Sequence, residues 1–231
     1  MQLFYNPTIE NDLILEKEEN THAIKVLRKQ TGDIVHIING NGDLFECELT
    51  QIGNKKSHVS IVSKTTTAKK NNLHIAIAPT KNNNRIEFFL EKATEIGISE
   101  ITPLLCDRSE RKVLKNERME KIILSAAKQS KNLWIPKLNP MQSLDSFLNQ
   151  EKGNQKFIAH CEEEEEKGNL LTYDINKSDP CIILIGPEGD FTKKEIEKAK
   201  KNDFNELSLG KSRLRTETAA IVACTHYNLI E

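Results

Sequence analysis

Two apolar runs near the C-terminus, each ended by a glycine-containing turn and followed by a helical pattern, constrain the fold more than any other feature of this sequence. The first run, CIILI at residues 181–185, has the length of a buried strand, and Gly186 and Pro187 end it. Thr192 and Glu195 then form a capping box, which predicts a helix directly after the turn.

The second unit repeats this order. Residues 207–209 form an apolar run, Gly210 breaks it, and residues 216–230 are predicted to be helical. Open α/β sheets bind their ligands at the edge where such turns gather. We therefore expect both turns to line one ligand site.

The middle of the chain shows the same alternation of strand and helix patterns. A strand is predicted at residues 73–78, a helix at 82–97 and a second strand at 98–106, an order that predicts a βαβ unit with parallel strands. A short helix at residues 143–149 and a strand at 156–160 continue the alternation. The predicted fold class of this part is α/β.

The N-terminal part has the pattern of a small antiparallel β unit. Short apolar runs at residues 32–38, 44–52 and 57–62 are separated by glycine and asparagine turns. The sequence NGNG at residues 39–42 predicts a β-hairpin with a type I′ turn, because that turn needs positive φ angles at both of its central residues. A helix is predicted at residues 21–30.

The polar stretch SKTTTAKKNN at residues 63–72 is predicted to be a linker. It divides the chain into a domain at residues 1–70 and a domain at residues 73–231.

Composition excludes some classes without identifying a function. A chain of 231 residues buries about 70% of its unfolded surface, and a net charge of -1 favours no partner. The five cysteines are scattered, with no CxxC pair and no histidine at ligand spacing, which disfavours disulfides and metal and fits a reduced cytosol. No signal sequence and no apolar run near the roughly 20 residues of a membrane helix is present, so we expect a soluble cytoplasmic protein.

With so small a net charge, any nucleic-acid surface must come from local clustering of positive residues. Residues 108–137 are the most basic segment and form a candidate RNA-facing stripe, although the same segment fits the solvated face of an amphipathic helix equally well. Trp134 is a candidate for stacking on a base, but a lone tryptophan is more often core. Cations of the 21–30 helix form a possible phosphate-contacting edge or, more often, an ordinary solvated face. The candidate RNA contacts are His22, Arg28, Lys29, Lys81, Arg108 and Arg111.

The glycine turns match neither common nucleotide-binding motif. GPEG at residues 186–189 lacks the lysine and hydroxyl of a P-loop, and GxGxxG is absent. The backbone N–H and C=O groups of the two turns remain as candidate ligand contacts, because glycine lets a ligand approach them closely. His160 and Cys161 suggest a nucleophile or metal site, but with no second ligand nearby a strand-end pair lining a pocket is favoured.

Several phrases, in order along nearly the whole chain, are similar to one known family. IGPEGDF at residues 185–191 and LGKSRLRTETA at 209–219 resemble the signature of the RsmE-type ribosomal RNA uridine-N3 methyltransferases, of the SPOUT superfamily. Further matching phrases are HAIKVLRK at 22–29, RIEFFLEKATEIGISEITPL at 85–104, DRSE at 107–110 and AAKQSKNLWIPKL at 126–138. Several ordered motifs are far more specific than one glycine-rich turn.

The resemblance implies a small PUA-like β-barrel followed by an α/β methyltransferase domain with a trefoil knot. It implies a homodimer that uses S-adenosylmethionine to methylate N3 of a uridine in 16S rRNA of the small ribosomal subunit. The cofactor contacts that it implies are His160, Ile185, Gly186, Pro187, Glu188, Gly189, Leu209, Gly210, Ser212 and Leu214. Arg215, Thr216 and Glu217 are its implied catalytic residues, with Arg215 stabilising the uridine anion and Glu217 accepting a proton or orienting Arg215.

Read without the resemblance, the residues after the second turn have an ordinary explanation. Thr216 or Thr218 is a suitable N-cap, and Glu217 a first-turn carboxylate. The chain also departs from the family pattern at Asp190, where glycine is usual, and at residues 211–213, where an arginine is displaced by one position. Lys128 and Asn132 replace charged partners of the family's EQxxR motif. The alternatives are a related enzyme acting on another RNA, such as tRNA, and a non-catalytic RNA-binding protein.

Overall fold

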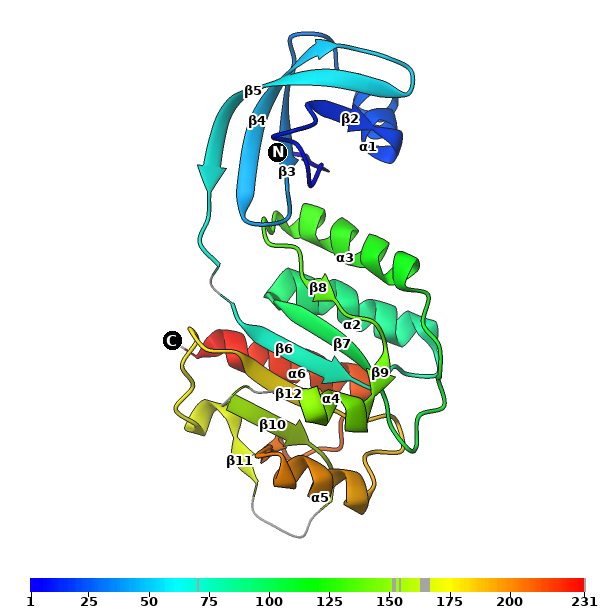
Figure 1. Cartoon of the computed structure of the whole chain (residues 1–231), viewed down its shortest axis with the longest axis vertical. Coiled ribbons are helices and arrows are strands. Elements are labelled where there is room, and N and C mark those ends of the chain that lie inside the picture. Colours follow the sequence, from blue (N-terminus) through cyan, green and yellow to red (C-terminus); the bar gives the residue numbers. More distant parts are fainter. Residues whose placement is uncertain (70, 151–152, 154, 163–166, 231) are drawn as a thin grey trace. The chain divides into compact units, whose positions relative to one another are not determined.

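The computed structural model describes residues 1–69, 71–150, 153, 155–162 and 167–230. The chain forms two compact units (Figure 1). The N-terminal unit comprises Met1–Lys69 and Ala127–Ile135, and the C-terminal unit comprises Lys70–Ala126 and Pro136–Glu231.

The N-terminal unit is built on one sheet, as the alternating pattern predicted. Its strands lie in the order β1-β3-β4-β5-β2, with only β1 and β3 parallel among the described pairs. Apolar side chains from these strands, including Phe4, Val35 and Phe45, pack into one buried cluster. The strands are β1 Leu3–Tyr5, β2 Ile14–Glu16, β3 Ile34–Ile38, β4 Asp43–Gln51 and β5 Lys56–Thr66.

The predicted hairpin joins β3 to β4, but its turn is not type I′. Gly40 and Gly42 have φ angles of 84° and 91°, whereas Asn41 between them is not in the left-handed region. A Cβ on Gly42 would lie 2.6 Å from the Trp134 ring, and Trp134 Nε1 donates a hydrogen bond to the Thr67 carbonyl at 2.9 Å. Trp134 therefore has a packing role at this turn.

Two boundaries predicted for this part of the chain were wrong. The helix expected at residues 21–30 is instead α1, Lys17–Thr21, continued by a π-helical turn, His22–Val26, that ends with the Leu27 N–H bonded to the His22 carbonyl. The linker expected at 63–72 is still strand as far as Thr66, because this stretch continues the antiparallel pairing with β4, and the hydroxyls of Ser63 and Thr66 also donate to carboxylates of that strand.

The C-terminal unit contains a parallel sheet, as predicted. Its strand order is β11-β13-β10-β12-β6-β7-β8, and β9 pairs with the far end of β7. Every described pair in it is parallel. The strands are β6 Leu73–Ile77, β7 Glu100–Leu105, β8 Lys137–Leu138, β9 Gln142–Ser143, β10 Gln155–Ala159, β11 Gly168–Asn169, β12 Cys181–Ile185 and β13 Asn205–Ser208.

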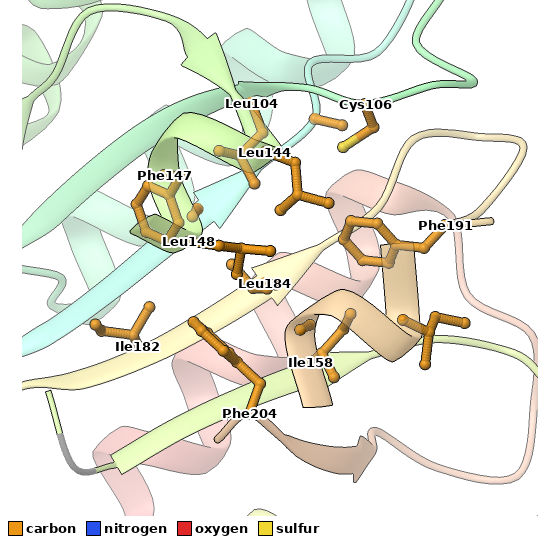
Figure 2. Packing of buried hydrophobic residues seen from close by; sticks show 14 residues of the cluster. Leu104, Cys106, Leu144, Phe147, Leu148, Ile158, Ile182, Leu184, Phe191 and Phe204 are labelled. Atoms are coloured by element: carbon orange, nitrogen blue, oxygen red, sulfur yellow. The ribbon is translucent and has the colours of Figure 1, made fainter. Parts of the chain in front are cut away.

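Helices cover both faces of this sheet. On one face, α4 and α5 pack on β12 and its neighbours through a buried cluster that includes Phe147, Leu184 and Phe191 (Figure 2). On the other face, α6 contacts β6 and β12 and packs against α2. The helices are α2 Asn83–Ile96, α3 Asn116–Ser130, α4 Leu144–Gln150, α5 Lys193–Lys201 and α6 Thr216–Leu229, with a 3₁₀ turn at Leu170–Thr172.

Most predicted elements of the C-terminal unit lie within two residues of their expected bounds, because strong local signals fix them. Asn82 caps α2 by accepting from the Asn84 N–H, and Gly97, with a φ of 117°, ends it. The capping box of Thr192 and Glu195 starts α5 as predicted. The two-residue strands β8, β9 and β11 were not predicted, since pairs of residues carry no periodicity.

Candidate functional site

The predicted gathering of turns at one sheet edge is confirmed. A cavity of about 810 Å³ lies at the carboxyl ends of β10, β12 and β13. The residues directly after all three strands line it, and the first turn of α6 closes part of its wall. Its size is in the range of pockets for small molecules and cofactors.

Most of the predicted cofactor contacts belong to this cavity wall. Those that line it are His160, Ile185, Gly186, Pro187, Glu188, Leu209, Gly210, Ser212 and Leu214. Gly189 does not, because it faces the other side of the turn, where its carbonyl accepts from Arg108 Nη1 at 2.8 Å. Arg85 and Lys167 also line the cavity and were missed, since neither belongs to the two glycine turns that follow β12 and β13.

The turn after β12, which we call the cofactor loop (residues 186–191), is tightly packed. A Cβ on Gly186 would lie 3.0 Å from the Phe191 ring and 3.1 Å from its backbone nitrogen, so this position favours glycine. Pro187 accepts from the Asp190 N–H at 2.9 Å and closes the turn. The loop therefore has little freedom to adopt another conformation.

Asp190, the departure from the usual glycine, has a structural explanation. Its φ is 63°, a left-handed conformation that aspartate tolerates better than most residues. One carboxylate oxygen accepts from the Cys161 N–H and the other from the Phe191 N–H, both at 2.8 Å. The side chain thus joins the loop after β10 to the cofactor loop, a connection that glycine lacks.

Two substitutions of Asp190 separate the contribution of its carboxylate hydrogen bonds from that of its left-handed backbone conformation. Asp190→Gly loses the carboxylate bonds but keeps the left-handed backbone, and we expect the free energy of unfolding to fall by about 1 kcal/mol. Asp190→Ala loses the same bonds and also disfavours the left-handed backbone, so its free energy of unfolding should fall by about 1 kcal/mol more than that of Asp190→Gly. Urea denaturation of the two variants measures the difference. Equal stability of the variants would contradict this account of the turn.

The turn after β13 also needs its glycine. Gly210 has a φ of 131°, which side chains rarely adopt. The chain then reaches Arg215, which occupies the N-cap position of α6 without a side-chain capping bond. The simpler explanation was therefore wrong in placing the N-cap at Thr216 or Thr218, but its first-turn carboxylate, Glu217, is confirmed. The positive end of α6 adjoins the cavity, which favours negative charge there.

The three predicted catalytic residues do not all face the cavity. Arg215 and Thr216 line it, whereas Glu217 is buried behind it with 7% of its surface exposed. Glu217 Oε1 lies 3.7 Å from Arg85 Nε, and Oε2 has no hydrogen-bond partner within the described part of the chain. In this arrangement Glu217 pairs with Arg85 and not with Arg215, and both arginines line the cavity.

His160 contributes a hydrogen-bond acceptor to the wall. Its Nε2 lies 2.9 Å from Glu206 Oε1, and burial, with the nearby Lys167 ammonium, lowers the pKa of the imidazole. A neutral ring beside a carboxylate carries its hydrogen on Nε2. Nδ1 is then an acceptor, and it is buried without a partner among the residues that the structure describes.

The structure gives no support to a nucleophile or a metal site at His160 and Cys161, directly after β10. Burial and the Asp190 carboxylate raise the pKa of the Cys161 thiol, the opposite of what activates a cysteine nucleophile. Within the described ranges no group of three or more His, Cys, Asp and Glu is placed to hold a metal ion. The four glutamates at 163–166 lie outside the described residues. No described helix is long and apolar enough to cross a membrane.

The predicted RNA contacts fall on both units. His22, Arg28 and Lys29 belong to the N-terminal unit, and Lys81, Arg108 and Arg111 to the C-terminal unit. The guanidinium groups of Arg108 and Arg111 are hydrogen-bonded to backbone carbonyls of the protein itself.

Helix α3, in the basic segment, has the predicted apolar face. Met119, Ile123 and Ala126 are buried on it. Two of its cations are paired, Arg118 with Glu87 at 2.7 Å and Lys128 with Glu19 at 2.6 Å. These pairs favour the structural explanation for those two positions, and RNA contact by the segment remains a prediction.

Comparison with known proteins gives matches over almost the whole chain. A family model described as RNA methyltransferase domain matches residues 67–228, and one described as RNA methyltransferase PUA domain matches residues 15–62. Ribosomal RNA small subunit methyltransferase E of Mesomycoplasma hyopneumoniae is 33% identical over 97% of this chain and 97% of its own.

Solved structures agree with these matches. A "probable rRNA-methyltransferase" from Porphyromonas gingivalis is 37% identical, with a TM-score of 0.90 over 97% of this chain and 95% of its own. Ribosomal RNA small subunit methyltransferase E of Neisseria gonorrhoeae, solved bound to S-adenosyl methionine, is 26% identical, with a TM-score of 0.82 over 97% of this chain and 95% of its own.

Proposed function

The chain belongs to the RsmE-type family of RNA methyltransferases, and from that membership we propose that it methylates N3 of a uridine in 16S rRNA of the small ribosomal subunit. S-adenosylmethionine is the methyl donor, in keeping with the cofactor-bound Neisseria relative. The observation that carries the proposal is the cavity formed by the two glycine turns at the sheet edge. The PUA-like N-terminal unit is the expected RNA-binding partner of this site.

The residues of the cavity fit such a cofactor. Exposed backbone groups of the loops after β12 and β13 suit an adenine edge and a ribose, and the cavity volume of about 810 Å³ suits a ligand of this size. His160 Nδ1 offers a buried acceptor that has no partner within the described residues. Residues 185–188 and 209–214, together with His160, would hold the cofactor.

The chain's own contribution to the chemistry is positioning and charge. When bound, S-adenosylmethionine supplies an activated methyl group. Arg215 stabilises the negative charge that develops on the uracil ring as N3 loses its proton, and the N-terminus of α6 adds to this field. Arg85, paired with Glu217, is another cation at the same cavity. No covalent enzyme intermediate is needed.

Positioning of the two reactants should lower the activation barrier of methyl transfer more than any single general base does. Uridine N3–H is a weak acid, and each pKa unit above the ambient pH costs about 1.4 kcal/mol. Well-oriented approach of two reactants supplies roughly 7–11 kcal/mol. Glu217 is buried with an unpartnered oxygen in the described structure, which suits a proton acceptor only if Arg85 moves aside.

We further propose a homodimer, a trefoil knot in the C-terminal segment and a cytoplasmic location, as the family resemblance implies. A dimer is supported by α6, where the apolar side chains of Ile221 and Val222 are only partly buried and 65% of Leu229 is exposed.

Nucleoside mass spectrometry of 16S rRNA tests the reaction and the substrate together. A strain lacking this gene should lose one 3-methyluridine from 16S rRNA and regain it when the gene is restored. Loss of the modified base from tRNA instead would favour a related enzyme acting on another RNA. Unchanged nucleosides, with no binding of S-adenosylmethionine by calorimetry, would indicate a non-catalytic relative.

A further inference from the structure

The segment directly after β7, residues 107–111, contains the DRSE motif, to which the proposed chemistry gives no role. The residues that line the cavity in the described structure do not include any member of this segment. The segment instead contacts the cofactor loop from outside the cavity, through Arg108. We call residues 107–111 the brace segment.

Arg108 makes the most direct contact. Its Nη1 donates to the Gly189 carbonyl at 2.8 Å and to the Phe191 carbonyl at 3.5 Å. Its aliphatic stem also packs closely, since a Cβ on Gly189 would lie 3.3 Å from Arg108 Cβ and Cδ. A charged donor on two carbonyls of one turn fixes that turn more firmly than a neutral donor does.

Arg111 acts on the same loop through a neighbouring one. Its Nε donates to the Thr80 carbonyl at 2.8 Å, and Nη2 donates to the Lys81 carbonyl. The Lys81 N–H in turn donates to Glu188 Oε1 at 2.9 Å. Arg111 therefore fixes the backbone that holds the side chain of a cavity-lining residue.

Asp107 extends the connection to the helix that follows the cofactor loop. Its N–H donates to Glu195 Oε1 at 2.8 Å. Glu195 is buried and forms the capping box of α5, which begins two residues after Phe191. The brace segment thus contacts both the cofactor loop and the helix that follows it.

We propose that the brace segment is a positioning element for the cofactor, with Arg108 as its principal residue. This inference depends on the proposed use of S-adenosylmethionine and assigns the segment a role in holding it. A binding site made of backbone groups needs its loop fixed before the ligand arrives, because ordering the loop on binding weakens affinity. The guanidinium of Arg108 is exposed, but its Nη1 is hydrogen-bonded to carbonyls of the cofactor loop, so we expect its main effect to be on cofactor affinity and not on RNA.

Calorimetric titration of S-adenosylmethionine into the full chain, without RNA, tests this role. Arg108→Met keeps much of the stem but loses the donor, and we expect its Kd to rise about fivefold to tenfold. Arg111→Met acts one step further away, and its Kd should rise about twofold to threefold. Lys194→Ala, which removes an exposed cation from α5, is the matched control and should bind like the unchanged chain.

The result separates this inference from the proposed function. If the unchanged chain binds and Arg108→Met binds within twofold of it while RNA affinity falls, Arg108 is an RNA contact and the brace is disproved. If the unchanged chain itself fails to bind, the proposed function fails and the inference with it. Thermal unfolding of each variant verifies folding, and the exposed position of Arg108 makes a folded variant the expected outcome.

Discussion

Replacing Arg215 with alanine is expected to reduce methyl transfer by about 100-fold to 1000-fold while changing the Kd of S-adenosylmethionine less than threefold. The guanidinium lines the cavity beside the N-terminus of α6, where it can stabilise charge that develops only during the reaction. Removing one fixed donor of this kind from an enzyme typically costs that much in kcat. Single-turnover assays with radiolabelled cofactor and 16S rRNA measure the rate.

The expected loss is not a folding effect. Arg215 holds the N-cap position of α6 through its backbone and makes no side-chain capping bond, so alanine removes no hydrogen bond of the helix. The unfolding temperature of Arg215→Ala should therefore match that of the unchanged chain. Full transfer activity in a folded variant would refute the catalytic role.

Phe191→Ala should lower the free energy of unfolding by about 3–5 kcal/mol, the usual cost of removing a fully buried aromatic side chain. Phe191 has 0% of its surface exposed and lies near Leu144 and Leu184, between the sheet and its covering helices (Figure 2). Its ring also packs against Gly186 in the cofactor loop, so cofactor affinity should fall together with stability.

Phe191→Leu is the matched control, because leucine retains much of the buried volume. We expect it to lose less than half as much stability as the alanine variant. Urea denaturation followed by circular dichroism gives both values. A loss below about 1 kcal/mol for Phe191→Ala would mean that the loop and the core are independent of each other.

The strands and helices around the site were predictable because each has a strong local signal. The apolar run at 181–185, the capping box at Thr192 and the glycine at 97 are properties of neighbouring residues, and β12, α5 and α2 follow them. The shared cavity followed from a general rule for open α/β sheets. Local periodicity and one topological rule were sufficient for this part.

Side-chain pairing could not be predicted, because it depends on contacts between distant parts of the chain. Glu217 was expected to accept a proton or orient Arg215, but its neighbour is Arg85, which stands 132 positions earlier in the sequence. Asp190 could be recognised as unusual but not as the acceptor for the Cys161 N–H. The extension of β5 to Thr66 likewise depends on its pairing with β4, as far as Asp43.

A crystal structure of the chain grown with saturating S-adenosylmethionine is the most direct test of the site. We expect one cofactor per chain, held between residues 185–188 and 209–214, with its methyl group on the side of Arg215. Density for the cofactor anywhere else, or an unfilled cavity at saturating concentration, would contradict the assignment of these two turns as the methyl-donor site.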